Sequence, residues 1–380
     1  MGQFSDTLLI HGGIDGDATT GAVSVPIYQT STYRQQALGQ LTSKYEYSRT
    51  ANPTRDALEA LIAEMEGGEA GFAFASGLAA TTAVLLLFRT GDKLLLSSNV
   101  YGGTFRVLDK VFKPLGIGYE IVDMRDLAAV EAAFTADVKG VVVESPTNPL
   151  LEVTDIAAVA AIAKSRGALT IVDNTFLTPY LQRPIALGAD IVVHSATKYL
   201  GGHSDLIAGL AVVNTPELAQ RLHFLQNATG GVLSPHDSWL LVRSIKTLGV
   251  RMDRHIENAK HVVEHLRRHP AVDRVYYPDN DVNARQAKGP GAMVSFVLKE
   301  GYDAPTFFGA VKLITLGESL GGVESLLTHP ASMTHAAIPA DIRQRVGIVD
   351  NLARLSVGLE SKEDIVADLD QAIETARMRR

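Results

Sequence analysis

Three short apolar runs, each followed by a polar residue, recur at a regular interval in the middle of the chain. The runs cover residues 140–144, 169–172 and 191–193, and the polar residues are Asn148, Asp173 and Lys198. From 148 to 173 and from 173 to 198 the interval is 25 positions, about the length of one strand–helix step in a parallel sheet. Carboxyl ends of parallel strands share one edge of a sheet, so these side chains should lie together.

The remaining pattern predicts an α/β chain with two units. Apolar runs alternate with helical stretches from about 70 to 240, which is typical of βαβ units. Beyond Trp239 amphipathic helices prevail, with a strand expected at 291–297 and a last helix capped by the Ser361 hydroxyl. Because 380 residues exceed what one core usually supports, we expect a large domain (47–240) and a C-terminal domain (241–380). The first 46 residues (1–46) show no sustained periodicity and are expected to form an N-terminal arm that reaches a neighbouring subunit.

Two helix starts are legible in the first hundred residues. Asn52 can cap a helix whose first turn contains Pro53, and Gly67-Gly68 should end it. Ser76-Gly77-Leu78 precedes a second helical run, 79–84. The free backbone N–H groups at such a helix start can bind a phosphate.

Composition argues against several kinds of partner. A net charge of −7 without any basic run does not suit nucleic-acid binding. The chain has no cysteine, so it has no disulfide and no thiolate ligand. The longest apolar run, 83–88, is far shorter than the ~20 residues of a membrane span, and no signal peptide is legible at the N-terminus. We expect a cytoplasmic protein that binds neither membranes nor nucleic acid.

Metal and nucleotide sites are not expected either. The histidines show no recognised ligand pattern, and His329 and His335 are six positions apart. The glycines form neither a dinucleotide-binding fingerprint nor a P-loop.

Several stretches resemble the Cys/Met-metabolism family of enzymes that use pyridoxal phosphate (PLP). The longest is residues 190–204, DIVVHSATKYLGGHS, and the other matching blocks are 45–54, 75–78, 101–104, 145–149, 172–175 and 354–358. The resemblance spans almost the whole chain. It implies a fold type I PLP-dependent transferase-like fold, with a mostly parallel sheet in a large domain and a smaller C-terminal α/β domain, and it implies PLP as the cofactor.

The resemblance also assigns roles at the cofactor. Lys198 would attach PLP covalently and transfer protons, Asp173 would keep the pyridine nitrogen protonated, and Asn148 would support the ring hydroxyl. A protonated pyridine is a strong electron sink, which agrees with a carboxylate at that position. Tyr101 would stack on the ring and relay a proton. The other residues expected to bind the cofactor are Ser76, Gly77, Leu78, Ser195 and Thr197, with Tyr47 and Arg49 contributed by the neighbouring subunit.

Substrate-binding residues follow from the same resemblance. Arg354, after an expected helical segment, would clamp the substrate α-carboxylate, and Ser319 would contact the lysine or that carboxylate. Glu318 and Glu46 match acidic positions in cystathionine γ-lyases and γ-synthases, where two carboxylates can receive the distal ammonium of cystathionine. Arg106 and Asn148 complete the expected substrate site.

The choice of reaction rests on fewer residues. Within this family one lysine supports β-elimination, γ-elimination and γ-replacement. The run 318–326 resembles cystathionine γ-lyase most, with β-lyase or desulfhydrase activity on homocysteine or cysteine as a side reaction. The alternatives are a γ-synthase or homoserine-ester sulfhydrylase, a β-lyase, and a non-catalytic protein that binds PLP or an amino acid. We expect a homotetramer, a dimer of dimers with shared active sites.

Overall fold

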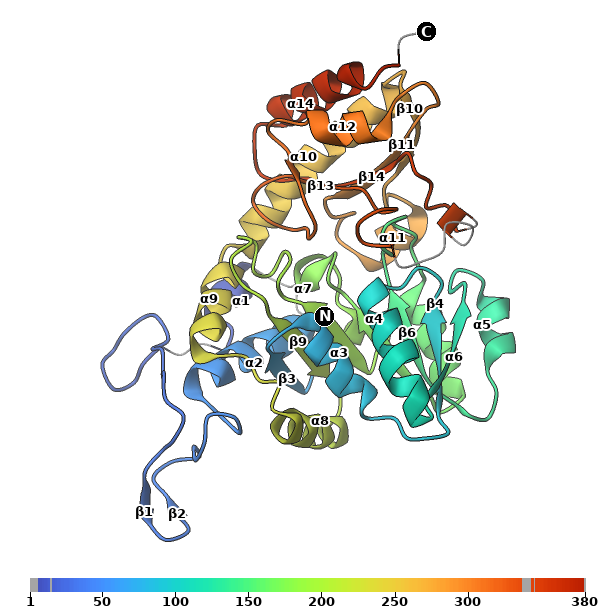
Figure 1. Cartoon of the computed structure of the whole chain (residues 1–380). Coiled ribbons are helices and arrows are strands. Elements are labelled where there is room, and N and C mark those ends of the chain that lie inside the picture. Colours follow the sequence, from blue (N-terminus) through green and yellow to red (C-terminus); the bar gives the residue numbers. More distant parts are fainter. Residues whose placement is uncertain (1–5, 14–15, 337–342, 345, 379–380) are drawn as a thin grey trace.

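The computed structural model describes residues 6–13, 16–336, 343–344 and 346–378, and its largest element is a seven-stranded sheet (Figure 1). The strand order is β3-β9-β8-β7-β6-β4-β5, and β9 runs opposite to the other six strands. The strands are β3 (Ala70–Phe74), β4 (Lys93–Ser97), β5 (Gly118–Val122), β6 (Val138–Glu144), β7 (Leu169–Asp173), β8 (Ile191–Ser195) and β9 (Gly209–Val213). The three predicted central strands are therefore confirmed, and they are adjacent and parallel.

Both faces of this sheet are buried, which explains the continuous apolar runs. Ile191 and Val193 belong to one hydrophobic cluster, whereas Val192 between them belongs to the cluster on the opposite face. Alternate side chains of a strand point to opposite faces, so a strand covered on both sides is apolar throughout. The helices of this part of the chain are α2 (Pro53–Glu66), α3 (Gly77–Leu85), α4 (Gly102–Val107), α5 (Leu127–Ala133), α6 (Ile156–Ser165), α7 (Thr178–Leu181), α8 (Pro216–Thr229) and α9 (Pro235–Ile245).

A second, five-stranded sheet lies beyond the long helix α10 (Leu248–Arg268), at the top of Figure 1. Its order is β10-β11-β14-β13-β12. The strands are β10 (Val272–Tyr276), β11 (Met293–Leu298), β12 (Thr315–Leu316), β13 (Leu326–Thr328) and β14 (Leu352–Ser356), and the helices are α11 (Asp281–Gln286), α12 (Ala304–Ala310) and α14 (Lys362–Thr375). The expected mixed α/β architecture, with a smaller C-terminal sheet, is confirmed.

The predicted helix starts are found, with one error in their chemistry. Asn52 Oδ1 accepts the N–H of Thr54 at 3.0 Å, and α2 ends at Gly67, whose φ of 74° is left-handed. Ser361 does precede α14, but its hydroxyl caps no helix N–H. The hydroxyl donates to the Glu363 carboxylate at 3.4 Å.

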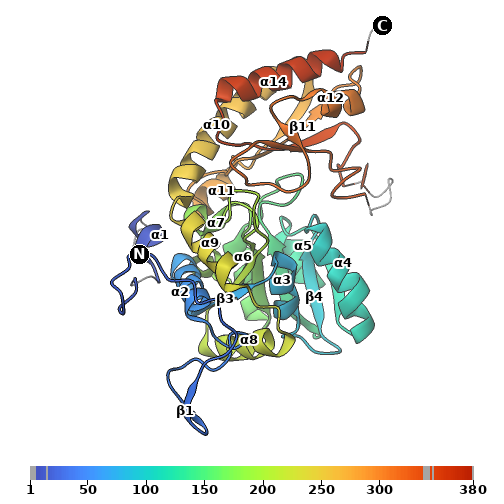
Figure 2. The same ribbon diagram turned by 60° about the vertical axis from the view of Figure 1, so that its left-hand side comes forward.

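The first 46 residues contain more local structure than an extended arm. Helix α1 (Asp6–His11) buries Leu9 in the main core. The hairpin of β1 (Gln35–Ala37) and β2 (Gln40–Leu41) projects away from the rest of the molecule, as Figures 1 and 2 both show. Leu38 at its tip is fully exposed. None of the helices in the described part of the chain combines the length and apolar character of a membrane span.

Candidate active site

A cavity of about 270 Å³ lies at the carboxyl edge of β6, β7 and β8. Residues from the C-terminal part of the chain, 318–320 and Arg354, form part of its wall. Among the residues predicted from the sequence, the cavity brings together Ser76, Gly77, Leu78, Tyr101, Asn148, Asp173, Ser195, Thr197, Lys198, Glu318, Ser319 and Arg354. The three residues predicted from the 25-residue spacing, Asn148, Asp173 and Lys198, therefore line the same cavity.

Lys198 lies three residues beyond the end of β8, and its amine points at the opposite wall. Its Nζ donates a hydrogen bond to Ser319 Oγ at 2.6 Å. Burial, aided by the positive charge of Arg354 and opposed by Glu318, lowers the pKa of Lys198 to about 8. A lower pKa increases the neutral fraction of the amine, which is the form that attacks a carbonyl carbon.

Asp173, the last residue of β7, presents a carboxylate to the cavity. Its Oδ1 accepts both the N–H of Thr175 at 3.0 Å and the Thr175 hydroxyl at 2.6 Å, and Oδ2 is available to a partner in the cavity. Burial raises the pKa of Asp173, while the bonds with Thr175 and the nearby His194 lower it. A partly desolvated carboxylate is stabilised by a cationic partner, so this position suits a protonated pyridine nitrogen.

The start of α3 provides donors for an anionic group. Ser76 Oγ accepts the N–H of Ala79 at 3.0 Å, which leaves the first backbone N–H groups of the helix for another acceptor. Gly77 packs against Ser195, and a Cβ at Gly77 would lie 2.8 Å from Ser195 Cβ. Only glycine permits this approach, and it brings the helix start and the Ser195 hydroxyl to the same end of the cavity. The donor set fits the phosphate of PLP.

Arg354 is buried, with 2% of its surface exposed. Its Nη1 donates to Asn148 Oδ1 at 2.9 Å, and Nη2 donates to the Ser319 carbonyl at 2.9 Å and to Thr328 Oγ1 at 3.1 Å. Within the described chain, its Nε is buried and has no hydrogen-bond partner. An unpaired buried guanidinium N–H suits a carboxylate ligand. Arg354 lies within strand β14, an element that the sequence analysis did not predict.

Glu144 is a cavity residue to which the sequence analysis gave no role. It ends strand β6, and its carboxylate accepts the backbone N–H of Tyr101 at 2.6 Å and that of Asn148 at 3.1 Å. Burial and the neighbouring Asp173 raise the pKa of Glu144, whereas the two N–H groups and Arg354 lower it. The signal in the sequence was a carboxylate at the end of an apolar run, in register with Asp173.

Four predicted site residues do not line this cavity within one subunit: Glu46, Tyr47, Arg49 and Arg106. All four are exposed. Arg49 Nη1 donates to the Asn227 carbonyl at 2.6 Å, and its guanidinium carbon lies 5.5 Å from the centre of the Tyr47 ring. The roles expected for Tyr47 and Arg49 require a second subunit and stay predictions.

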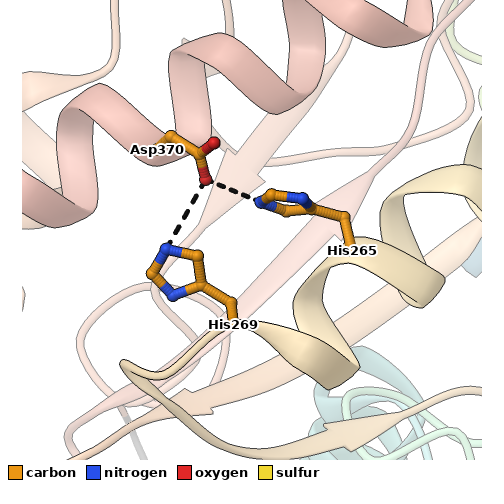
Figure 3. A group of neighbouring side chains, drawn as sticks. All are labelled: His265, His269 and Asp370. Atoms are coloured by element: carbon orange, nitrogen blue, oxygen red, sulfur yellow. Dashed lines mark hydrogen bonds and ion pairs between the residues drawn. The ribbon is translucent and has the colours of Figure 1, made fainter.

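One histidine cluster was not predicted from the sequence, and Figure 3 shows it. His265 and His269 are four positions apart near the end of α10, and both face Asp370 of α14, with Nε2–Oδ1 distances of 2.6 and 3.6 Å. However, His269 Nδ1 accepts the N–H of Ala271 at 3.2 Å, so the proton of the neutral ring resides on Nε2 and faces the carboxylate. A metal bound at Nε2 would need the opposite tautomer. The cluster therefore joins α10 to α14 by hydrogen bonding.

Comparison with known proteins identifies the family of the chain. The model of the Cys/Met metabolism PLP-dependent enzyme family matches residues 6–374. A cystathionine gamma-lyase of Bacillus subtilis (strain 168) is 55% identical over 97% of this chain and 98% of its own length. A cystathionine beta-lyase of Lactococcus lactis subsp. cremoris is 56% identical over the same shares.

Solved structures extend the agreement to three dimensions. The crystal structure of cystathionine gamma-lyase from Lactobacillus plantarum, complexed with L-serine, has a TM-score of 0.95 and 53% identity, covering 98% of this chain and 99% of that one. The structure of metB from Corynebacterium glutamicum has a TM-score of 0.93 and 43% identity, over 97% of both chains. The chain belongs to the Cys/Met-metabolism family of PLP-dependent enzymes.

Proposed function

We propose that this chain is a carbon–sulfur lyase that cleaves cystathionine by γ-elimination, giving cysteine, 2-oxobutyrate and ammonia. The observation that carries the proposal is the single cavity in which Lys198, Asp173 and Arg354 meet, with Glu318 in its wall. PLP, when bound there, supplies an electron sink for the negative charge that develops on the substrate carbons. Relatives of near-equal identity are named gamma-lyase and beta-lyase, so the residues at the distal end of the substrate decide between them.

Each residue then has a separate task. Arg354 binds the α-carboxylate through its free Nε, and Asn148 holds the guanidinium from the other side. The Lys198 amine, steadied by Ser319 Oγ, removes protons from the substrate carbons. Tyr101 keeps its phenol at the cavity mouth, with 45% of its surface exposed, and donates a proton to the departing sulfur.

Glu318 supports cleavage at the γ-carbon rather than the β-carbon. It is exposed in the cavity wall, and its negative charge opposes the lowering of the pKa values of both Lys198 and Arg354. A carboxylate near both groups can bind the distal ammonium of cystathionine by a charge-assisted hydrogen bond. When both charged ends of the substrate are bound, the bond between sulfur and the γ-carbon is the one that lies near the Lys198 amine.

Replacing Glu318 with valine should lower kcat/KM for cystathionine by about 10- to 150-fold, because a charged hydrogen bond contributes roughly 1.5–3 kcal/mol. Homocysteine lacks the distal ammonium and should lose much less. Product analysis that separates 2-oxobutyrate from pyruvate, with both substrates, measures the effect.

The variant Glu318→Gln is the matched control, since it keeps the shape and removes only the charge. It should reproduce most of the loss with cystathionine. If both variants lose activity equally on cystathionine and homocysteine, together with thermal stability, Glu318 maintains the turn and does not select the reacting carbon.

We also propose that the active sites are shared between subunits, with Tyr47 and Arg49 completing the phosphate site of the neighbour. The projecting hairpin and the absence of Arg49 from the residues that line its own cavity support this. Subunits with Arg49→Ala and with Lys198→Ala should each be inactive alone. After mixing and exchange, about a quarter of the normal sites should be intact, because half of random pairs are mixed and each has one complete site.

A pairing of Lys198→Ala with Asp173→Asn is the control for this experiment. Both of these residues line one cavity of one subunit, so mixing cannot restore a site. If mixed assemblies of the first pair are demonstrated by mass spectrometry and remain inactive, Arg49 does not act on the neighbouring subunit.

A further inference from the structure

The Glu144 carboxylate accepts two hydrogen bonds from backbone outside the sheet. Its side chain is 6% exposed and lies in the cavity wall. Its two oxygens are divided between two segments far apart in sequence: Oε2 accepts the N–H of Tyr101 and Oε1 that of Asn148. One rigid strand end thus holds the backbone of both segments.

The Glu144 carboxylate binds the backbone N–H of Tyr101 directly before the first turn of α4. Tyr101 directly precedes α4, makes no side-chain capping bond, and is 45% exposed. The ring folds back over Gly103, where a Cβ would lie 2.3 Å from Tyr101 Cε1. The position of the phenol therefore follows from the backbone at Tyr101, which the Glu144 carboxylate holds at 2.6 Å.

The Asn148 segment links Glu144 to Arg354, the residue proposed to bind the substrate α-carboxylate. Asn148 is buried, and its side-chain oxygen accepts from Arg354 Nη1 at 2.9 Å. Ser319, whose carbonyl accepts from the same guanidinium, also contacts Lys198. A shift of the Asn148 backbone would therefore move the guanidinium and its free Nε.

We propose that Glu144 is a positioning residue: by binding the N–H groups of Tyr101 and Asn148 it sets the phenol and the arginine clamp relative to each other. This inference rests on the proposed function of the site, and it assigns Glu144 no direct contact with the substrate. Because a carboxylate accepts at both oxygens whereas an amide accepts at only one, Glu144→Gln keeps the shape and must set an NH₂ group against one of the two N–H donors.

The first test uses the unmodified protein without cofactor. In hydrogen exchange at single-residue resolution, the Tyr101 amide should exchange at least about 100-fold more slowly than the amides of Gly102 and Gly103, which lack intrahelical acceptors at the first turn of α4. Equal exchange at the three positions would overturn the proposal, whether or not any variant folds.

The second test compares Glu144→Gln with Glu152→Gln. Glu152 accepts from Asn99 Nδ2 at 2.7 Å and pairs with Arg125, so it holds the same loop from outside the cavity. In Glu144→Gln, kcat should fall about 10- to 150-fold. Exchange at Tyr101 should become faster, and the visible circular dichroism of the bound cofactor should decrease at unchanged cofactor content.

Glu152→Gln should change kcat less than about twofold and leave Tyr101 exchange unaltered. A loss of melting temperature in Glu144→Gln without change in Tyr101 exchange or in the cofactor spectrum would show a merely structural role. If the unmodified protein fails to cleave cystathionine, the proposed reaction is wrong, but exchange at Tyr101 and the spectrum still test Glu144.

Discussion

Lys198→Ala is expected to reduce turnover by at least about a thousandfold while the protein stays folded. The change removes both the covalent attachment point of PLP and the base that transfers protons, and general acid–base catalysis alone contributes about 10²- to 10⁴-fold. The lost amine has a hydrogen bond to Ser319 Oγ, so its removal leaves that hydroxyl free to bind water in the cavity. Turnover, thermal unfolding and cofactor labelling by borohydride measure the outcome.

The labelling experiment identifies the lysine directly. Borohydride should fix cofactor to the unmodified protein and fail to fix it to Lys198→Ala. The exposed Lys139, whose amine donates to the Ala136 carbonyl, provides the control: Lys139→Ala should label and turn over normally. Labelling that persists at another lysine in Lys198→Ala would refute the assignment of the attachment site.

The central strands and their polar ends were predictable because the signals are local. Strands buried on both faces are apolar throughout, and one strand–helix step has a nearly fixed length. Asn148, Asp173 and Lys198 therefore met at the predicted sheet edge. The start and end of α2 were predictable for the same reason, since Asn52 and Gly67 act within one turn of their own positions.

Arg354 shows where local pattern fails. Strand β14 is short, all five of its residues are buried, and its middle residue is a charged one. A charged side chain within a buried strand interrupts the apolar run by which such strands are recognised. The guanidinium is stabilised by hydrogen bonds to Asn148, Ser319 and Thr328. These residues are distant from Arg354 in sequence, so no periodic pattern could predict them.

Glu144 and the histidine cluster mark two other limits. The bond of Glu144 to Tyr101 joins positions 43 residues apart, and no spacing rule predicts which backbone N–H a strand-end carboxylate will meet. By contrast, the four-residue spacing of His265 and His269 is visible in the sequence itself. What the sequence does not indicate is that Asp370, on another helix, lies opposite them.

Asp173→Asn should lower kcat by about 10²- to 10³-fold or more with little loss of bound cofactor, because the protonated form of the pyridine nitrogen, without its negative partner, is disfavoured by about 3–5 kcal/mol. Asparagine preserves the shape and its oxygen can still accept from Thr175. Its NH₂ group, however, cannot hold a proton on the pyridine nitrogen, so the ring becomes a weaker electron sink. Steady-state kinetics and the visible absorption spectrum check this result.

The control separates charge from the local hydrogen bonds. Thr175→Val removes the hydroxyl that bonds to Asp173 Oδ1 at 2.6 Å but leaves the carboxylate in place. One hydrogen bond to a charged group contributes about 1.5–3 kcal/mol at most, so this variant should lose less activity than Asp173→Asn. If Asp173→Asn loses less than about tenfold while Thr175→Val loses more, the carboxylate acts mainly by organising the turn after β7, and another group must keep the pyridine nitrogen protonated.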